Sequence, residues 1–271
     1  MSLCRMTVTD SKCRVRVEKQ LSRTFEVSSG VRQGDALSPV LFNLALEFVF
    51  RKSNMPPNNN LIMNKSTQVL AYADDEDLLA RSAAAVKELF IHLEEAAQEM
   101  GLHINESKTF YMSTARDGVR RDLQCGDTSF EGVTSFKYLG SIVTSDNSVE
   151  DDIKARIAAG NRVFFSLQTL FRSKYLSTST KLRMYKTLVR PVVTYGSESW
   201  TLTADDERRL MTFERKVLRS IYGPVRLKNG DYRLQMIFEF RDLFKEPDMM
   251  AWVSFDLVES GGWVTLHEPT R

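Results

Sequence analysis

Two adjacent carboxylates, Asp74 and Asp75, are the side chains in this sequence best suited to hold a metal ion. Apolar residues alternate along 69–73 and return at 78–80, a pattern typical of two short strands, and Asp favours the tight turn that would join them. We therefore predict a β-hairpin with both carboxylates at its tip. Like charges this close repel each other, and a hard divalent cation such as Mg²⁺ removes the repulsion because it prefers carboxylate oxygens. A solvated acidic turn is the simpler interpretation of a bare Asp-Asp pair, so the rest of the chain must decide.

The composition is that of a globular protein large enough to bury a substantial core. The 271 residues are 42% hydrophobic and 27% charged, which allows one large domain or two. No basic start followed by an apolar run is visible, and no apolar stretch is long enough to span a bilayer, so we expect neither secretion nor a membrane partner. The three cysteines, Cys4, Cys13 and Cys125, are widely spaced, which favours reduced thiols inside the cell and argues against a cysteine-based zinc site.

Charge is distributed unevenly along the chain. Residues 151–230 carry 16 Lys and Arg against 7 Asp and Glu, a net charge of +9, whereas residues 53–150 carry 8 against 15, a net charge of −7. A basic segment beside an acidic one suits metal chemistry next to a polyanion such as nucleic acid. An accidental distribution of surface charge is the alternative interpretation.

Alternating apolar and polar residues predict three hairpins in the first half of the chain. They span residues 13–28, 69–80 and 133–144, the last with Gly140 near its bend. Two segments do not fit that pattern. Residues 102–112 read as strand, turn and strand, and residues 113–131 are polar and read as irregular.

Helical spacing predicts two helices between these hairpins. The first, at 39–52, follows a glycine-containing loop, and its Ser-Pro start is favoured at the beginning of a helix. The second, at 83–100, follows Ser82 as its cap and ends at Gly101. The side chains that we expect the first helix to bury are Val40, Leu41, Leu44 and Phe48.

From residue 149 the sequence takes the period of helices. The predicted helices span residues 149–172, 179–190 and 204–221. Pro191 interrupts this region, and Thr203 with Asp206 has the spacing of a capping box before the last helix. Strand-rich material followed by helices indicates an α+β domain and then a helical one.

Four motifs occur in an order that is highly specific. Gly-Val-Arg-Gln-Gly-Asp-Ala-Leu-Ser-Pro stands at 30–39, Tyr-Ala-Asp-Asp at 72–75, Gly-Leu-His-Ile-Asn-Glu-Ser-Lys-Thr at 101–109 and Phe-Lys-Tyr-Leu-Gly-Ser at 136–141. This series resembles the palm of the reverse transcriptase of a non-LTR, LINE-type retrotransposon. Two later motifs, at 185–191 and 195–200, resemble the thumb and connecting region of the same family.

The resemblance implies an RNA-directed DNA polymerase, which adds deoxynucleotides to a primer 3′ end by catalysis with two Mg²⁺ ions. The partners it implies are an RNA template with a DNA primer, or an RNA–DNA duplex, and deoxynucleoside triphosphates. The basic segment would hold the duplex through its phosphates. The family logic places such a protein in the nucleus or the cytoplasm and leaves its oligomeric state open.

The same resemblance implies roles for particular residues. Asp74 would be a direct metal ligand, and Asp75 a second ligand or a support for the first. The residues expected to bind nucleotide and template are Arg32, Gln33, Gly34 and Lys108, although a solvated lysine is an equally simple interpretation of the last. The hairpin expected to grip the primer terminus contains Phe136, Tyr138, Leu139 and Gly140, for which core packing is the alternative role.

The chain departs from the family pattern where a further aspartate is needed. The family places it on a strand upstream of residues 30–39, and this chain has only Asp10 there, in a polar turn. We expect the chain to lack the fingers of the family as well. Because two carboxylates on one turn cannot bracket two Mg²⁺ ions, we expect this chain alone to be inactive. Glu76 is a second departure, since the family has an apolar residue there that packs into the palm.

These inferences predict an α+β fold, with an incomplete palm in which an antiparallel sheet packs on helices, followed by a helical thumb-like domain. We place the partial palm at 1–145, the helical thumb or connection at 146–250 and an irregular tail at 251–271. Two other interpretations stay open. The chain could be a non-enzymatic nucleic-acid-binding remnant, or a degenerate retrotransposon fragment without function.

Overall fold

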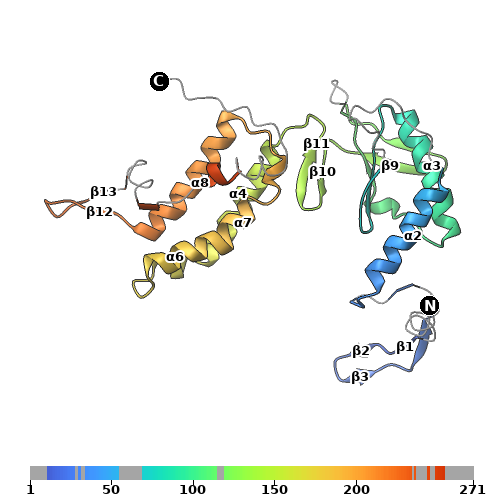
Figure 1. Ribbon diagram of the computed structural model, residues 1–271, viewed down its shortest axis with the longest axis horizontal. Helices are drawn as coiled ribbons and strands as arrows, with labels where there is room; N and C mark the ends of the chain where they lie inside the picture. The colour runs from blue at the N-terminus through green and yellow to red at the C-terminus, as the bar shows by residue number, and fades with distance from the viewer. Residues whose placement is uncertain are drawn as a thin grey trace. The chain divides into compact units, whose positions relative to one another are not determined.

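The computed structural model describes residues 11–27, 30–31, 34–54, 69–114, 119–233, 235, 243–244 and 248–253 of the chain. Helices and short strands are mixed, which confirms the predicted α+β class. The chain forms two compact units, one made of residues 1–111 and 121–132 and the other of residues 112–120 and 133–271. Figure 1 labels their elements.

Two helices and a small sheet form the core of the first unit. They are α2 (Ser38–Lys52), α3 (Ala83–Glu99), β8 (Leu123–Cys125) and β9 (Thr128–Gly132). Val49 of α2 packs against Leu93 and Ala97 of α3. On the same helix Phe90 meets Phe130 of β9 edge to face, with ring centroids 4.8 Å apart. This core holds α3 between α2 and the sheet (Figure 1).

The predicted boundaries of both helices are confirmed. Ser82 caps α3 by accepting a hydrogen bond from the Ala85 amide at 3.2 Å, and Gly101 follows the helix in the left-handed region. α2 begins at Ser38 with Pro39 in its first turn. Two basic residues in its last turn lie where the helix dipole favours positive charge.

The predicted buried face of α2 was wrong. The helix buries Leu46 and Val49, and leaves Val40, Leu44 and Phe48 exposed, with Leu41 intermediate. Apolar residues surround most of this helix, so its sequence does not single out one stripe. The contact with α3 determines which face of α2 is buried, and the sequence of α2 alone does not reveal that contact.

The hairpin that contains the carboxylate pair forms as predicted. β5 (Val69–Tyr72) pairs antiparallel with β6 (Asp75–Leu78). Leu78, at the base of β6, packs against both apolar clusters of the first unit. The base of the hairpin is therefore anchored in the core, whereas Leu70 and Tyr72 on β5 are exposed.

The N-terminal hairpin is also confirmed. β1 (Ser11–Cys13) pairs with β4 (Phe25–Val27), and β2 (Arg16–Val17) pairs with β3 (Gln20–Leu21). The described side chains of β2, β3 and β4 are exposed.

Residues 102–132 differ from the prediction in two ways. Residues 102–104 form no strand, and η1 (Glu106–Lys108), a 3₁₀-helix, leads into β7 (Phe110–Tyr111). The segment read as irregular contains β8 and β9, because Leu123, Cys125 and Phe130 are drawn into the core beside Phe90. β7 pairs with β9 in parallel, so the three-stranded sheet β7–β9–β8 is not purely antiparallel, as the predicted sheet was, and among the described strands β5 and β6 form a separate sheet.

Helices dominate the second unit, as predicted. They are α4 (Glu150–Ser166), α5 (Gln168–Arg172), α6 (Thr178–Met184), the π-helical η2 (Tyr185–Val189), α7 (Arg190–Val193) and α8 (Ala204–Tyr222). The capping box before α8 is present, since Thr203 and Asp206 each bond the other's backbone amide. Pro191 does not end the helix but follows a π turn, because proline has no amide hydrogen to donate to residue 187.

A single apolar core joins these helices. Its fully buried side chains include Ile153, Tyr185, Val193 and Leu210. Gly160 of α4 allows close packing, since a Cβ there would lie 2.3 Å from Val193 Cγ2 and 3.0 Å from Phe213 Cζ. Trp200 is 2% exposed and belongs to this core.

The third predicted hairpin falls in the second unit. β10 (Ser135–Tyr138) pairs with β11 (Ser141–Thr144), and β11 contacts α4. The division at residue 132 therefore groups this hairpin with the helices, whereas the sequence predicts it in the palm part. A short pair, β12 (Val225–Arg226) with β13 (Tyr232–Arg233), follows α8. None of the helices that the structure describes is long and apolar enough to cross a membrane.

Candidate functional site

The carboxylate pair lies at the solvent-exposed end of the β5–β6 hairpin. Asp74 is a turn residue, whereas Asp75 begins β6 opposite Tyr72, so only one of the two lies in the turn itself. Both side chains are exposed and accessible to ions. Ala73, the first turn residue, has a φ of +56°, as a type II′ turn requires. That conformation costs a non-glycine residue about 1–2 kcal/mol, and such strain concentrates at functional sites.

Glu76 follows the pair in a less polar environment. It lies on β6 opposite Ala71 and is half-buried. Burial raises the pKa of the Glu76 carboxyl above its ordinary value, because desolvation disfavours the charged form. An uncharged side chain therefore suits this position better than a carboxylate.

The loop before α2 and Lys108 supply the other residues expected in the first unit. Gly34 has a φ of +89°, and a Cβ added there would meet no atom within 4 Å, so the backbone is open to an approaching ligand. Arg32 and Gln33 lie outside the described residues. Lys108 is exposed and ends η1, so it stands on a helical turn and not on the predicted strand.

The third hairpin forms as predicted, and its proposed role at the primer terminus stays a prediction. Leu139 and Gly140 form its turn with φ values of +45° and +93°, which is the pattern of a type I′ turn. Phe136 and Tyr138 are half-buried on one face of β10, with ring centroids 6.4 Å apart. The two rings therefore pack on each other, while the turn stays accessible.

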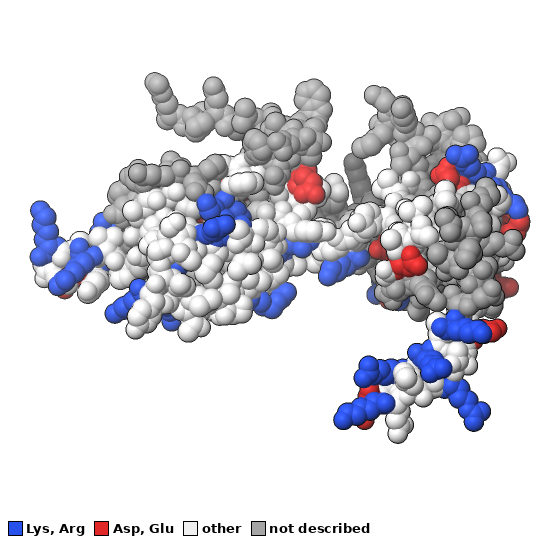
Figure 2. All heavy atoms as spheres, turned by 60° about the horizontal axis from the view of Figure 1, so that its bottom comes forward, with Lys and Arg blue, Asp and Glu red and all other residues white. Residues whose placement is uncertain are grey.

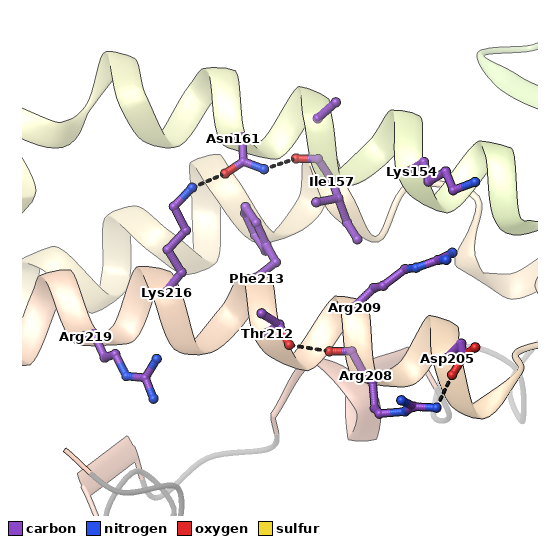
Figure 3. Close-up of a pocket in the computed structure, with 11 residues that line it drawn as sticks. Lys154, Ile157, Asn161, Asp205, Arg208, Arg209, Thr212, Phe213, Lys216 and Arg219 are labelled. Carbon is purple, nitrogen blue, oxygen red and sulfur yellow. Dashed lines mark hydrogen bonds and ion pairs between the residues drawn. The ribbon is translucent and has the colours of Figure 1, made fainter. Parts of the chain in front are cut away.

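A groove of about 860 Å³ lies between α4 and α8 (Figure 3). Ile157 and Phe213 form part of its apolar lining, and Asn161 adds an amide. Five cations also line it: Lys154, Arg208, Arg209, Lys216 and Arg219. Asp205 is the one carboxylate among its described lining residues.

The groove cations differ in their partners. Lys154 and Arg209 lie 2.9 Å and 2.7 Å from the Glu150 carboxylate, and Arg208 pairs with Asp205. Lys154 first and Arg209 second lower the pKa of Glu150. Two cations have no carboxylate within ion-pair distance among the described residues: Lys216 and Arg219.

Comparison with known protein families shows which family this chain belongs to. The family described as "Reverse transcriptase (RNA-dependent DNA polymerase)" matches residues 2–143, more than half of the chain. The chain belongs to the reverse transcriptase family. The matched range contains the carboxylate hairpin, Gly34, Lys108 and the turn of the third hairpin.

Several relatives narrow the class of reverse transcriptase. The chain is 29% identical over 161 residues to the "Retrovirus-related Pol polyprotein from type-1 retrotransposable element R2" of Nasonia vitripennis, covering 55% of this chain and 15% of that protein. It is 28% identical over 221 residues to the "Probable RNA-directed DNA polymerase from transposon X-element" of Drosophila melanogaster (77% and 23%). It is 24% identical over 235 residues to the "RNA-directed DNA polymerase from mobile element jockey" of the same species (77% and 23%). The chain is thus a reverse transcriptase domain related to those of non-LTR retrotransposons, and it spans less than a quarter of each of these relatives.

The β5–β6 hairpin offers the type of ligand atom that magnesium binds. Asp74 and Asp75 offer exposed carboxylate oxygens, the ligands that Mg²⁺ prefers. Across the part of the chain that the structure describes, no cluster of three or more His, Cys, Asp or Glu could hold a metal ion. Asp10 lies outside that part.

Sequence reasoning identified the basic segment of the chain but not the individual residues that line the groove. Residues 205, 208, 209, 212, 216 and 219 recur at helical spacing and share one face of α8. That spacing could have found the α8 wall of the groove. The α4 wall could not be assigned to it, because the pairing of the two helices depends on packing at Gly160.

Proposed function

We propose that the chain binds the phosphate backbone of a template–primer duplex in the groove between α4 and α8. The observation that carries this proposal is the pair Lys216 and Arg219, two exposed cations for which no described carboxylate is an ion-pair partner. Such groups gain most from phosphate, because binding releases the counterions of the duplex. In the view of Figure 2 the helical unit shows scattered Lys and Arg side chains among mostly uncharged residues, and few carboxylates.

The remaining groove cations support the same role. Lys154, Arg208 and Arg209 hold exposed or half-exposed ion pairs, which contribute at most about 1 kcal/mol each to stability. Exchanging such a carboxylate for a phosphate costs little. The groove can therefore present up to five cations to a duplex, and among the described residues Lys216 and Arg219 are the two without a carboxylate partner. Lys216 instead donates a hydrogen bond to Asn161 Oδ1 at 2.7 Å.

Fluorescence anisotropy with a labelled RNA–DNA duplex tests the groove. We expect the double variant Lys216→Gln/Arg219→Gln to bind at least about tenfold more weakly than the unmodified chain. The matched control, Arg226→Gln/Lys228→Gln, removes the same charge from the exposed β12–β13 hairpin. Equal losses in both double variants would show that only net charge matters, and would overturn the proposal.

The carboxylate hairpin is proposed as the metal-binding part of a nucleotidyl-transfer site. Asp74 and Asp75 would hold Mg²⁺ at the exposed end of a hairpin whose base is fixed by Leu78. When bound, this metal would activate a primer 3′-hydroxyl and stabilise the leaving pyrophosphate. Lys108 and the Arg32–Gly34 loop would bind the deoxynucleoside triphosphate and the template.

We further propose that the 271-residue chain does not extend a primer by itself. Two carboxylates on one hairpin are too few ligands for two metal ions. A primer-extension assay with the purified chain and Mg²⁺ checks this. Templated incorporation that disappears in Asp74→Asn would contradict the proposed inactivity and show that the ligand set is completed by another part of the chain.

A non-enzymatic or degenerate remnant is the second candidate. It is favoured by the exposed apolar face of α2, where Val40, Leu44 and Phe48 are 55%, 62% and 49% exposed. A functional nucleic-acid-binding chain should be monodisperse in solution and should bind duplex. We propose that it does so in the nucleus or the cytoplasm. A degenerate fragment should aggregate and bind a hydrophobic dye, so size-exclusion chromatography with dye binding separates the two.

A further inference from the structure

An exposed aromatic side chain continues the α4 wall of the groove. Four residues line the groove from α4 at helical spacing: Lys154, Ile157, Ala158 and Asn161. Phe165 follows four residues after the last of them, on the same face of the helix. It is 54% exposed, whereas its neighbour Phe164 is 2% exposed and fills the core. A single exposed apolar side chain is ordinary on a protein surface, and what distinguishes Phe165 is its place in the row of groove residues.

Lys216 of α8 links this ring to the groove. Its ammonium lies 4.6 Å from the centre of the Phe165 ring and donates a hydrogen bond to Asn161 Oδ1 at 2.7 Å. Figure 3 shows Lys216 reaching from α8 toward Asn161, with Arg219 on the next turn of α8. Glu150 pairs with a cation from each helix at the other end of the groove. The aromatic ring and the two exposed cations without a described carboxylate partner therefore lie at the same end.

The contacts of Lys216 are of a kind that a ligand can replace. A cation over an aromatic ring at an exposed site contributes little free energy, and a phosphate is a stronger partner for an ammonium than a neutral amide is. Once the ammonium turns to a phosphate, the face of the Phe165 ring is open. A nucleobase is planar and aromatic, and it stacks on such a ring whatever its sequence.

We propose that Phe165 is a stacking platform for an unpaired base at this end of the groove. Bases inside a duplex are stacked on their neighbours and cannot reach a side chain, so only a single-stranded extension presents a free base face. Lys216 and Arg219 would bind the phosphates beside that base. This inference rests on the proposed function, in which the groove holds a duplex, and it narrows the ligand to a duplex that continues into a single strand.

Fluorescence anisotropy of the full chain with three labelled RNA–DNA duplexes tests the platform. The first duplex has blunt ends, the second adds a short single-stranded extension at a 5′ end, and the third adds the same extension at a 3′ end. We expect the unmodified chain to bind at least one extended duplex about fivefold or more tightly than the blunt one, as expected for one stacked base. The preferred polarity identifies which strand reaches Phe165.

Two variants at this position separate stacking from apolar packing. Phe165→Leu keeps an apolar side chain without a ring and should lose most of the preference for the extended duplex, whereas Phe165→Tyr should retain it. Neither variant should change the affinity for blunt duplex. The matched control is Tyr175→Leu, at an aromatic side chain of the same unit that is 99% exposed, and it should leave the preference unchanged.

The outcomes separate this inference from the proposed function. The inference would be overturned by the absence of any preference for an extended duplex, by a preference that Phe165→Leu leaves unchanged, or by an equal loss in Tyr175→Leu. A chain that binds no blunt duplex would refute the proposed function instead. In that case a loss of affinity for the extended strand in Phe165→Leu would still decide whether the platform exists.

Discussion

Gly160→Ala tests the packing that brings α4 against α7 and α8. A methyl group at this position would lie 2.3 Å from Val193 Cγ2 and 3.0 Å from Phe213 Cζ, both of which are in the core. Val193 is β-branched and cannot rotate away easily. The helices must therefore separate, and Phe213, which lines the groove, must move with them.

The expected cost follows from two opposing effects. Overpacking a core typically costs about 1–3 kcal/mol, whereas replacing a helical glycine by alanine gains about 0.5–1 kcal/mol. We expect the variant to lose about 1–2 kcal/mol of unfolding free energy, or roughly 2–8 °C in melting temperature for a chain of this size. Urea unfolding followed by tryptophan fluorescence, to which the buried Trp200 contributes, measures this loss. Duplex anisotropy should show weaker binding because the groove changes shape.

A double-mutant cycle supplies the control. Val193→Ala alone should cost roughly 2–3 kcal/mol, since it removes two buried methyl groups and leaves a cavity. In Gly160→Ala/Val193→Ala the new methyl group has room, so the double variant should be at least about 1 kcal/mol more stable than the sum of the single effects predicts. Additive effects, or a stabilised Gly160→Ala, would refute the packing of α4 described here.

Three further substitutions test local features. Ala73→Gly should stabilise the first unit by about 0.5–1 kcal/mol in urea unfolding, because glycine adopts the φ of +56° without strain; no gain would argue against that turn. Glu76→Gln should be more stable than the unmodified chain at neutral pH. The raised pKa means that the Glu76 carboxyl stabilises the fold fully below its ordinary value of 4.5 and that this contribution is lost as the pH rises through the folded-state pKa, so the advantage of the glutamine should shrink on acidification. Glu88→Gln, on an exposed position of α3, is the control and should show no such trend. Thr203→Ala should cost about 1 kcal/mol by removing the cap of α8, and an unchanged melting temperature would contradict the capping box.

Local patterns predicted the hairpins and most of the helices. The turn at residues 139–140, the cap at Ser82 and the capping box at Thr203 follow from short-range chemistry that the sequence displays directly. The turn of the carboxylate hairpin lies one residue earlier than predicted, at 73–74. The order of four motifs was enough to predict the family, which the match to residues 2–143 confirmed.

Long-range packing accounts for what the sequence did not predict. β8 and β9 are stabilised by the packing of Leu123 and Phe130 beside Phe90. The polar residues between these apolar side chains obscure the alternating pattern from which strands are predicted. The exposed face of α2 was misassigned because nearly every side of that helix is apolar. The hydrogen bond from the Trp200 indole to Asp152 joins residues far apart in the chain, which no local pattern connects. The roles of Asp74 and Asp75 in metal binding stay predictions.

The salt dependence of duplex binding tests the central claim most directly. If the groove neutralises phosphates, the logarithm of the association constant should fall linearly with the logarithm of the salt concentration, by about 0.7–0.9 for each phosphate contact. Lys216→Gln/Arg219→Gln should make this slope shallower by about 2, and the control pair at 226 and 228 should leave it unchanged. The same slope in all three proteins would contradict the claim that this groove holds the nucleic acid.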